Sequence, residues 1–307
     1  MKISFADFWC GFDSNNNFLL FLFREIYENV IVTDPSTCDC LIYGAFGKSH
    51  RNYNHCKKIF FNTEIHTLPN FDECDYSITS FFGSRDPEYQ KNFESKNVRI
   101  PLWMLHIDWF NVGSWGNPNW LIPVDYLVQD NPFTLKKKNK FCCTVYSNPR
   151  QERVDMVNII NQYKSVDCYG KCHNKQIPQQ NNHGGEFEKM NVISDYKFSI
   201  CFESGTPVDW GITDMFAVTT SEKLLHAKVA GNIPIYYSDE FYSKDFNKEC
   251  CLNLFDYSNM ESMLEDIIKI DNDNSRYESI LKEPLFTSKP NLNMFIDKIQ
   301  TCFDLKI

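Results

Sequence analysis

The chain has 307 residues, of which 43% are hydrophobic and 15% aromatic, and its formal net charge is −9 at a sequence pI near 5.3. This composition fits a globular protein of one large domain or two domains of ordinary size. The acidic balance argues against a general nucleic-acid-binding protein, which needs a basic face for phosphates. No apolar run of about 18 residues is present to span a membrane.

We expect a cytoplasmic or otherwise soluble protein. Asp7, Asp13 and a run of asparagines interrupt any apolar stretch of the kind that a signal peptide needs near the N-terminus. The thirteen cysteines are therefore expected to be mostly reduced thiols. They include the groups Cys38-x-Cys40, Cys142-Cys143, Cys168-x3-Cys172-His173 and Cys250-Cys251. None of these groups has the paired CxxC spacing of a structural zinc site, so we expect no metal site.

The first half of the chain alternates short apolar segments with turns. The predicted strands are residues 3–12, which lead into a loop, 30–33, 40–43, 58–62, 76–79 and 98–101. Residues 18–28 are predicted to form a helix, because Leu19, Leu20 and Phe23 recur on one side. Strands that alternate with helices indicate βαβ units and a parallel sheet.

Residues 129–140 predict a domain boundary, because they contain three consecutive lysines and a proline without apolar periodicity. We therefore expect an N-terminal domain over residues 1–135 and a C-terminal domain over 136–290.

The second half repeats the alternation. The predicted strands are residues 140–146, 165–169, 197–202 and 233–237, the predicted helices are 150–163, 221–230, 260–270, 274–281 and 291–304, and 172–188 are expected to form a surface loop. Two α/β halves predict two Rossmann-like domains that face a central cleft. Ligands bind such sheets beyond the carboxyl ends of the strands.

Residues 221–237 (SEKLLHAKVAGNIPIYY) predict an anion-binding helix start. Ser221 is suited to cap a helix, apolar residues follow at helical spacing, and Gly231 ends the helix before a buried strand. The free amides of a helix start favour anions, and Lys223 adds a full positive charge. A phosphate-bearing ligand fits this pattern, although a solvated pair of Glu222 and Lys223 fits it as well.

The same stretch, followed by Lys244-Asp245-Phe246, resembles the donor-binding signature of the α-1,3/1,4-fucosyltransferases, which form glycosyltransferase family 10. The preceding KFSICFE, residues 197–203, resembles the family's Phe-x-x-x-Phe-Glu-Asn motif. The resemblance implies an α/β protein of GT-B architecture whose second half binds the donor. In that fold the last helix, here within 291–307, often crosses back to the first domain.

The activity that the resemblance implies is inverting transfer of L-fucose from GDP-β-L-fucose to an oligosaccharide or glycoconjugate acceptor. The expected target is the 3-OH of an N-acetylglucosamine or glucose unit. Because no N-terminal anchor is seen, the chain is similar to the soluble bacterial or viral type. No metal cofactor is implied, and a divalent cation is expected to be at most stimulatory.

Glu64 follows the predicted strand 58–62 and resembles the family's proposed catalytic base, which takes the proton of the acceptor hydroxyl. Asp72, Glu73 and Asp75 are rival carboxylates nearby. From the pattern alone, a solvated loop glutamate is the favoured interpretation of Glu64, and the base role is what the resemblance implies.

The other implied roles concern the donor. The resemblance implies that Arg153 and Lys223 bind the diphosphate, and Arg150 competes with Arg153 for that role. It implies that Glu222 bonds the sugar or ribose hydroxyls and that Ser147 and Asn148 line the nucleotide end. Tyr169 would lie near the base. Two departures affect donor contacts: Ser204 and Thr219 stand where the family usually has Asn and Tyr. An insertion before Glu222, within residues 205–221, carries Trp210 and Phe216 and is expected either to cover a ligand or to pack a loop.

Several alternatives stay open at this point. A GT-B transferase for another nucleotide sugar and an inactive glycan-binding paralogue both fit the pattern. Asp271-Asn272-Asp273 has the letters of a metal-binding Asp-x-Asp motif but lies between two helical patterns, which predicts a turn. The tryptophans at 103, 109, 115 and 120 are suited either to stack on acceptor sugars or to fill the core.

Overall fold

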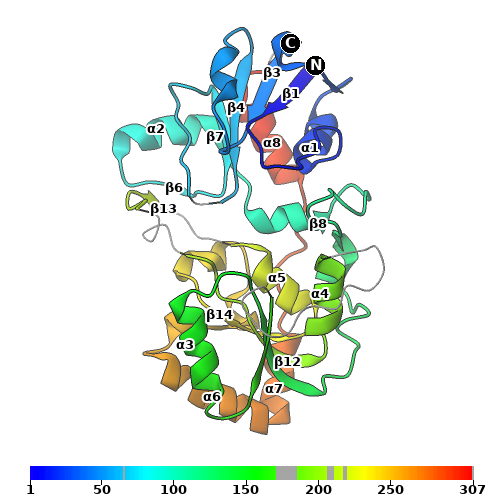
Figure 1. The fold of residues 1–307 in the computed structure, drawn as a ribbon, viewed down its shortest axis with the longest axis vertical. Coiled ribbons are helices and arrows are strands. Elements are labelled where there is room, and N and C mark those ends of the chain that lie inside the picture. The colour runs from blue at the N-terminus through cyan, green and yellow to red at the C-terminus, as the bar shows by residue number, and fades with distance from the viewer. Residues whose placement is uncertain (65, 171–184, 206–210, 217–219, 306–307) are drawn as a thin grey trace. The chain divides into compact units, whose positions relative to one another are not determined.

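The structure is a computed structural model, and it describes residues 1–64, 66–170, 185–205, 211–216 and 220–305. The chain forms two compact units. Unit 1 comprises residues 1–118, 205–219 and 291–307, and unit 2 comprises residues 119–204 and 220–290. Each unit is built around its own parallel β-sheet (Figure 1).

Unit 1 has a six-stranded parallel sheet in the order β2-β1-β3-β4-β5-β7. Its strands are β1 (Lys2–Ala6), β2 (Ile31–Val32), β3 (Cys40–Tyr43), β4 (Lys57–Asn62), β5 (Tyr76–Thr79), β6 (Gly83–Ser84), β7 (Asn97–Arg99), β8 (Ile107–Asp108) and β13 (Met215–Phe216), and its helices are α1 (Phe18–Ile26), α2 (Pro87–Lys96) and α8 (Asn293–Cys302). All four residues of β3 are buried, as expected for a parallel strand that is covered on both faces. The strands predicted at 40–43 and 76–79 are confirmed to the residue.

The last helix packs within unit 1. Phe303, which follows α8, stacks on Tyr76 of β5 with ring centroids 4.6 Å apart. The amide of Asp304 donates a hydrogen bond to the Tyr76 hydroxyl at 2.8 Å. Helix α8 also contacts α1 and β7 (Figure 1), so the final segment completes the cover of the first sheet.

The described part of the 205–221 insertion also belongs to unit 1. Strand β13 pairs antiparallel with β6, with Met215 opposite Ser84 and Phe216 opposite Gly83. The guanidinium of Arg85 lies 5.1 Å from the centre of the Phe216 ring. Phe216 thus packs a loop in unit 1, as one of the two interpretations predicted, whereas Trp210 lies outside the described residues.

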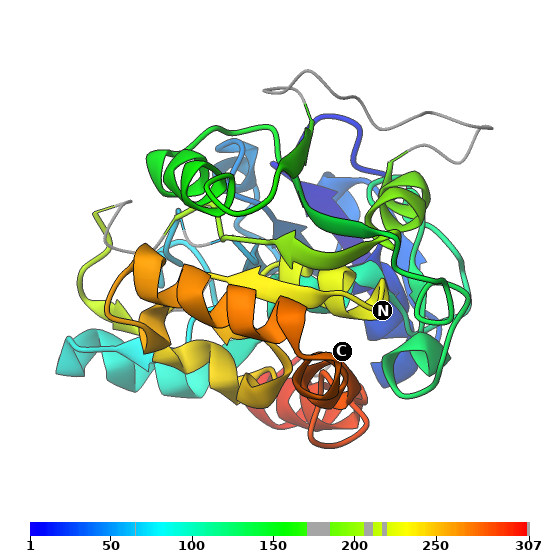
Figure 2. The same cartoon turned by 90° about the horizontal axis from the view of Figure 1, so that it is seen from below.

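Unit 2 has a five-stranded parallel sheet in the order β11-β10-β12-β14-β15. Its strands are β9 (Ile122–Pro123), β10 (Lys140–Val145), β11 (Val166–Tyr169), β12 (Tyr196–Ile200), β14 (Ile233–Tyr236) and β15 (Leu252–Asn253), and its helices are α3 (Gln151–Ile160), α4 (Glu186–Ile193), α5 (Glu222–Val229), α6 (Met260–Asn272) and α7 (Asn274–Lys282). Apolar residues of α3, α6 and α7 share one core cluster with the strands. Helices α4 and α5 contact each other and pack on β10 and β14, respectively, and Figure 2 shows the helices around this sheet.

The boundary between the units falls at Pro118–Asn119, earlier than the predicted 135–136. Asn131 Nδ2 donates to the carbonyl of Val229 at 3.1 Å, and Lys138 Nζ donates to the carbonyl of Ala230 at 2.6 Å. These contacts attach the lysine-rich segment to the end of α5, so it is part of the second unit and not a solvated linker.

Candidate active site

The strand order of unit 2 reverses between β10 and β12, which is where parallel sheets of this kind bind ligands. The loop after β10, the residues after β12 and the start of α5 come together there. Arg153 follows β10 in the chain and donates a hydrogen bond to the carbonyl of Phe202, which follows β12. Glu203 in turn bonds the residue that caps α5.

Helix α5 begins at Ser221, as predicted, and the Ser221 hydroxyl accepts a hydrogen bond from the amide of Lys223 at 3.3 Å. Glu203 holds this cap in place. Its carboxylate accepts from the Ser221 amide at 3.0 Å and the Ser221 hydroxyl at 2.6 Å, and also from the Tyr236 hydroxyl at 2.8 Å. The Glu203 side chain is only 3% exposed, so a buried carboxylate joins the start of α5 to β12 and β14.

Lys223 lies in the first turn of α5, and its Nζ is 3.4 Å from Glu203 Oε2 and 3.7 Å from Glu222 Oε1. Burial opposes the charge on Lys223, but Glu222 and Glu203 outweigh burial and raise its pKa. The ammonium is therefore charged at neutral pH. Glu222 is about as exposed as Lys223, with 21% and 19% of their side chains accessible.

Lys189 of α4 is a second lysine at this place that the sequence did not identify. Its Nζ lies 3.0 Å from Nδ1 of His226. Burial lowers the pKa of Lys189, while nearby Glu222 favours its charged form. Lys189 and Lys223 line the same small hollow beyond β10 and β12. The hollow therefore presents the Lys223 ammonium and the amine of Lys189 side by side.

The two arginine candidates have different environments. Arg153 is 2% exposed, and its two Nη atoms donate to the carbonyls of Asn148 at 2.9 Å and Phe202 at 2.8 Å. Arg150 is more accessible, with 25% of its side chain exposed, and donates to the carbonyl of Ser204 at 2.7 Å. The buried Arg153 thus holds the loop after β10 in place through its hydrogen bonds, whereas Arg150 is accessible at the surface of that loop.

The remaining donor candidates differ in accessibility. Ser147 and Asn148 are exposed on the loop after β10, and Ser204 is half-buried. Tyr169 is 8% exposed, and its hydroxyl shares a 2.7 Å hydrogen bond with that of Tyr196. Thr219 lies outside the described residues.

The Lys244-Asp245-Phe246 motif supports the same helix start. The Asp245 carboxylate accepts a hydrogen bond from the hydroxyl of Thr220, the residue before the cap. Phe246 is 3% exposed and lies against Phe286 with ring centroids 5.6 Å apart. Asp245 of the motif therefore holds Thr220, the residue that precedes the cap of α5.

Glu64 lies in unit 1, directly beyond the carboxyl end of β4. Its side chain is 61% exposed, and Oε2 is 3.1 Å from Nδ1 of His66. The Glu64 amide donates to Asn62 Oδ1 at 3.2 Å, which holds the backbone turn after the strand. The exposed carboxylate is thus accessible from solvent and has an imidazole beside it.

Two of the rival carboxylates are engaged elsewhere. Glu73 accepts from His50 Nε2 at 2.9 Å and binds Arg51 at 2.8 Å, and Asp75 binds Lys57 at 2.9 Å. The other ring nitrogen of His50 lies 2.7 Å from Asp7 Oδ2. Asp72 is exposed. These contacts give Glu73 and Asp75 structural partners, whereas Glu64 keeps most of its surface open.

Two family models match this chain. The N-terminal domain of the α-(1,3)-fucosyltransferase FucT matches residues 3–106, and the C-terminal part of glycosyltransferase family 10 (fucosyltransferase) matches residues 135–282. The two models describe parts of the same enzymes, and together they cover most of the sequence. The chain belongs to glycosyltransferase family 10.

Two curated fucosyltransferases are similar in sequence to this chain, over different portions of its length. The α-(1,3)-fucosyltransferase FucT of Helicobacter pylori is 25% identical over 321 aligned residues, which cover 94% of this chain and 61% of that protein. A provisionally named fucosyltransferase of Acanthamoeba polyphaga mimivirus is 30% identical over 179 residues, which cover 56% of this chain. The chain spans 28% of the length of the viral protein, so both relatives are substantially longer.

Solved structures share the fold. An α1,3-fucosyltransferase crystallised with GDP-fucose matches with a TM-score of 0.69 at 20% identity, covering 100% of this chain and 90% of that chain. HepE of Anabaena, crystallised with UDP and glucose, matches with a TM-score of 0.56 at 8% identity, covering 98% of each chain. The predicted GT-B fold is confirmed. Within the described ranges, no helix combines the length and apolar character that crossing a membrane requires.

The carboxylates of the Asp271-Asn272-Asp273 sequence have partners in unit 2. Asp271 is bound by Lys164 and Lys197, and Asp273 caps α7 by accepting from the amide of Ser275 at 2.9 Å. Asp271 and Asn272 end α6 and Asp273 alone separates it from α7, so the predicted junction of two helices is present but the turn is shorter than expected. Each carboxylate has a structural task there.

The tryptophans are divided between core and surface. Trp103 and Trp115 are 4% and 6% exposed, which fits the core interpretation for both. Trp109 donates from Nε1 to the carbonyl of Met104 at 2.8 Å, and Trp120 belongs to unit 2, against Phe133 and Phe187. A small hollow in unit 1 is lined by Trp115 together with Trp9, Phe12, Asp13, Asn16 and Asn117. It combines aromatic faces with amide and carboxylate groups.

Proposed function

We propose that this chain is an inverting fucosyltransferase that moves L-fucose from GDP-β-L-fucose to a hydroxyl of a glycan. The start of α5 carries the proposal, because Ser221, Lys223 and Glu222 stand at the carboxyl edge of a parallel sheet in a family 10 chain. A capped helix start with an ammonium suits a diphosphate. The GDP-fucose complex of a fucosyltransferase that shares this fold supports the choice of donor.

Lys223 neutralises the diphosphate as it leaves, and Glu222 accepts hydrogen bonds from sugar or ribose hydroxyls. Lys189, which lines the same hollow as Lys223, offers a second nitrogen donor there. Arg153 holds the loop of Ser147 and Asn148 toward the nucleotide, and Arg150 is the competing direct contact. Positioned cations of this kind stabilise a leaving group without a metal, and we propose that none is required.

Glu64 acts as the general base. As the acceptor oxygen bonds to the anomeric carbon, Glu64 takes its proton, and the bond from the anomeric carbon to the phosphate oxygen breaks with its electron pair leaving on GDP. Attack from the face opposite the leaving group inverts the anomeric centre. His66, 3.1 Å from the carboxylate, orients Glu64 for this step.

The acceptor is proposed to be a glycan that receives fucose at the 3-OH of N-acetylglucosamine or glucose. The side chains of Trp9, Phe12 and Asp13, which line this small hollow, suit contact with one face of a pyranose, because aromatic rings pack on an apolar sugar face and carboxylate groups bond sugar hydroxyls. Trp9 and Phe12 are both part-exposed, which leaves aromatic surface for such stacking.

The test is acceptor-dependent release of GDP. Purified protein is incubated with GDP-fucose, EDTA and a panel of N-acetyllactosamine-type and chitobiose-type acceptors, beside GDP-mannose and UDP-sugars. We expect release only from GDP-fucose, a fall of about 10²–10⁴-fold in Glu64→Gln, and full activity in the matched variant Asp72→Asn. Turnover of another sugar nucleotide would favour a different transferase. GDP-fucose binding without release from any acceptor would favour the inactive paralogue.

A further inference from the structure

Three potential metal ligands meet in unit 1 at the edge of the sheet where strands begin. Strands β3 and β4 are parallel neighbours with Cys40 opposite Lys57. Cys38 lies just before β3, and His55 and Cys56 lie just before β4, so the register brings the two approach loops together. The two sulfur atoms and a ring nitrogen of His55 all lie within 4.8 Å of one another.

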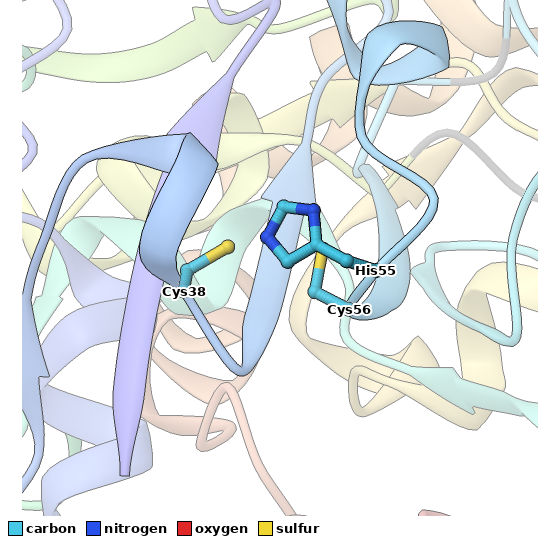
Figure 3. Close-up of side chains that lie close together, drawn as sticks. All are labelled: Cys38, His55 and Cys56. Carbon is cyan, nitrogen blue, oxygen red and sulfur yellow. The ribbon is translucent and has the colours of Figure 1, made fainter.

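We propose that Cys38, His55 and Cys56 bind a zinc ion. Figure 3 shows the thiol of Cys38 directed toward the His55 ring, with Cys56 beside that ring. Two thiolates and an imidazole are soft and borderline ligands, which bind zinc in preference to calcium or magnesium. The spacing of the sequence did not reveal the site, because its ligands come from two loops and have no CxxC pair.

The side chains can close onto an ion without moving the sheet. Zinc takes sulfur at about 2.3 Å and nitrogen at about 2.0–2.1 Å, so the ligand atoms need to approach one another slightly. His55 is exposed and Cys56 half-buried, which leaves both side chains room to turn. Cys38 is 3% exposed and fixes the buried side of the site. The exposed side leaves the fourth position of a tetrahedral ion to water.

Binding changes the protonation of the site. The Cys38 thiol now donates to the carbonyl of Pro35 at 3.3 Å. Zinc binds thiolates, so both cysteines release their protons to solvent on binding. No oxidant or reductant is needed. Because deprotonation is part of binding, zinc affinity should rise with pH.

The location indicates a structural role. The site lies before β4, whereas Glu64 lies after it, and six extended residues span roughly 20 Å. An ion here joins the loop before β3 to the loop before β4. It should stabilise unit 1 and leave the proposed transfer reaction unchanged.

The experiment uses the full chain, freed of metal and reduced, with free thiols counted before each measurement. Zinc is added, unbound metal is removed, and bound zinc is measured by elemental analysis. Cobalt is added to a parallel sample, because thiolate-bound tetrahedral cobalt has distinctive absorption. The variants are Cys56→Ser and His55→Ala, with Cys10→Ser as the control, since Cys10 is an exposed free thiol elsewhere in unit 1.

We expect one zinc per chain and a higher thermal midpoint with zinc in the natural sequence and in Cys10→Ser. Cys56→Ser should weaken zinc binding by more than the roughly 10–100-fold that changes around a metal site cost. His55→Ala, at an exposed position, should do the same while keeping its far-UV circular dichroism. Equal zinc binding in both site variants would overturn the proposal. So would a reduced natural protein that binds no zinc, or a Cys38–Cys56 disulfide that persists under reductant.

Discussion

The Glu203 carboxylate accepts a hydrogen bond from the Ser221 hydroxyl at 2.6 Å, although the two residues belong to different elements. The contact places the Phe202-Glu203 motif against the cap of α5. Tyr236 reaches the same carboxylate from β14 at 2.8 Å. One buried acid thus determines where α5 begins.

Glu203→Gln should weaken both the fold and donor binding. The amide has the size of the carboxylate but only one acceptor oxygen, and it loses the charge that faces Lys223. Breaking a buried hydrogen-bonded charge of this kind costs about 2–4 kcal/mol. Urea unfolding measures the stability, and calorimetry with GDP measures binding. In Tyr236→Phe one of the bonds is lost, and a cost of about 1 kcal/mol is expected. Unchanged GDP affinity in Glu203→Gln would separate this cap from the donor site.

Lys223→Met should lower kcat/KM for GDP-fucose by about 10²–10³-fold, because the leaving diphosphate loses a positioned cation. Lys228→Met is the matched control on the same helix. Lys228 donates to the carbonyls of Ile280 at 3.2 Å and Leu281 at 2.8 Å. Its loss should reduce stability by about 2 kcal/mol while turnover per folded molecule stays unchanged. Similar activity in both variants would remove Lys223 from the mechanism.

The two arginines should separate by phenotype. Arg153→Ala removes a buried guanidinium that bonds two carbonyls, so the free energy of unfolding should fall by about 3–5 kcal/mol. Arg150→Ala, on the more accessible side of the loop, should leave the unfolding curve nearly intact. If Arg150 contacts phosphate, the KM for GDP-fucose should rise about 10–100-fold in Arg150→Ala. An unchanged KM for GDP-fucose in Arg150→Ala would assign the diphosphate contact to Arg153.

Acid should weaken the Glu73 contacts of unit 1. Hydrogen bonds from His50 and then Arg51 lower the pKa of Glu73 from 4.5 to about 2. A carboxyl group whose pKa is lower in the folded state stabilises the fold above its unfolded pKa, and this contribution disappears as pH falls through the folded pKa. The stability gap between the natural protein and Glu73→Gln should therefore be full at pH 7 and shrink from about pH 4.5 toward pH 2.

Unfolding curves at a series of pH values check this prediction. Glu278→Gln is the control, because Glu278 forms an exposed pair with Lys282 at 3.2 Å, and such pairs contribute little. A gap for Glu73→Gln that is constant with pH would show that the His50 contact does not depend on the Glu73 charge.

The sequence predicted the strands well where apolar residues are bounded by turns. Residues 40–43 and 76–79 form buried runs of β-favouring residues, and both strands were predicted to the residue. The start of α5 was also predicted, because the Ser221 cap and the Gly231 stop are local signals. Gly231 has φ +74°, a conformation that favours glycine.

Two helices were missed for lack of an apolar face. In α2 the only buried residue is Phe93, so periodicity gave no signal. The Asp86 cap and Pro87 at the first helical position were the available markers. Helix α4 follows a polar stretch and buries only Met190 and Ile193. Lys189 was missed with it, since no motif marks that residue.

Long-range pairings were beyond local inference. Strand β13 has two residues, and its partner β6 lies far earlier in the chain. The surroundings of Arg153 could not be predicted either, because two backbone carbonyls from different loops surround it. In both places the contacts depend on tertiary packing and not on neighbouring residues.

Each unit is built from separate segments of the chain, and this has a consequence for protein engineering. The backbone passes from one unit to the other after residues 118, 204, 219 and 290. A chimera that joins the first half of one family member to the second half of another at a single junction would combine β13 and α8 of one parent with the β6 and β5 surfaces of the other. Recombination that respects these contacts must exchange residues 1–118, 205–219 and 291–307 as one set. A single cut in this chain therefore cannot separate its two units.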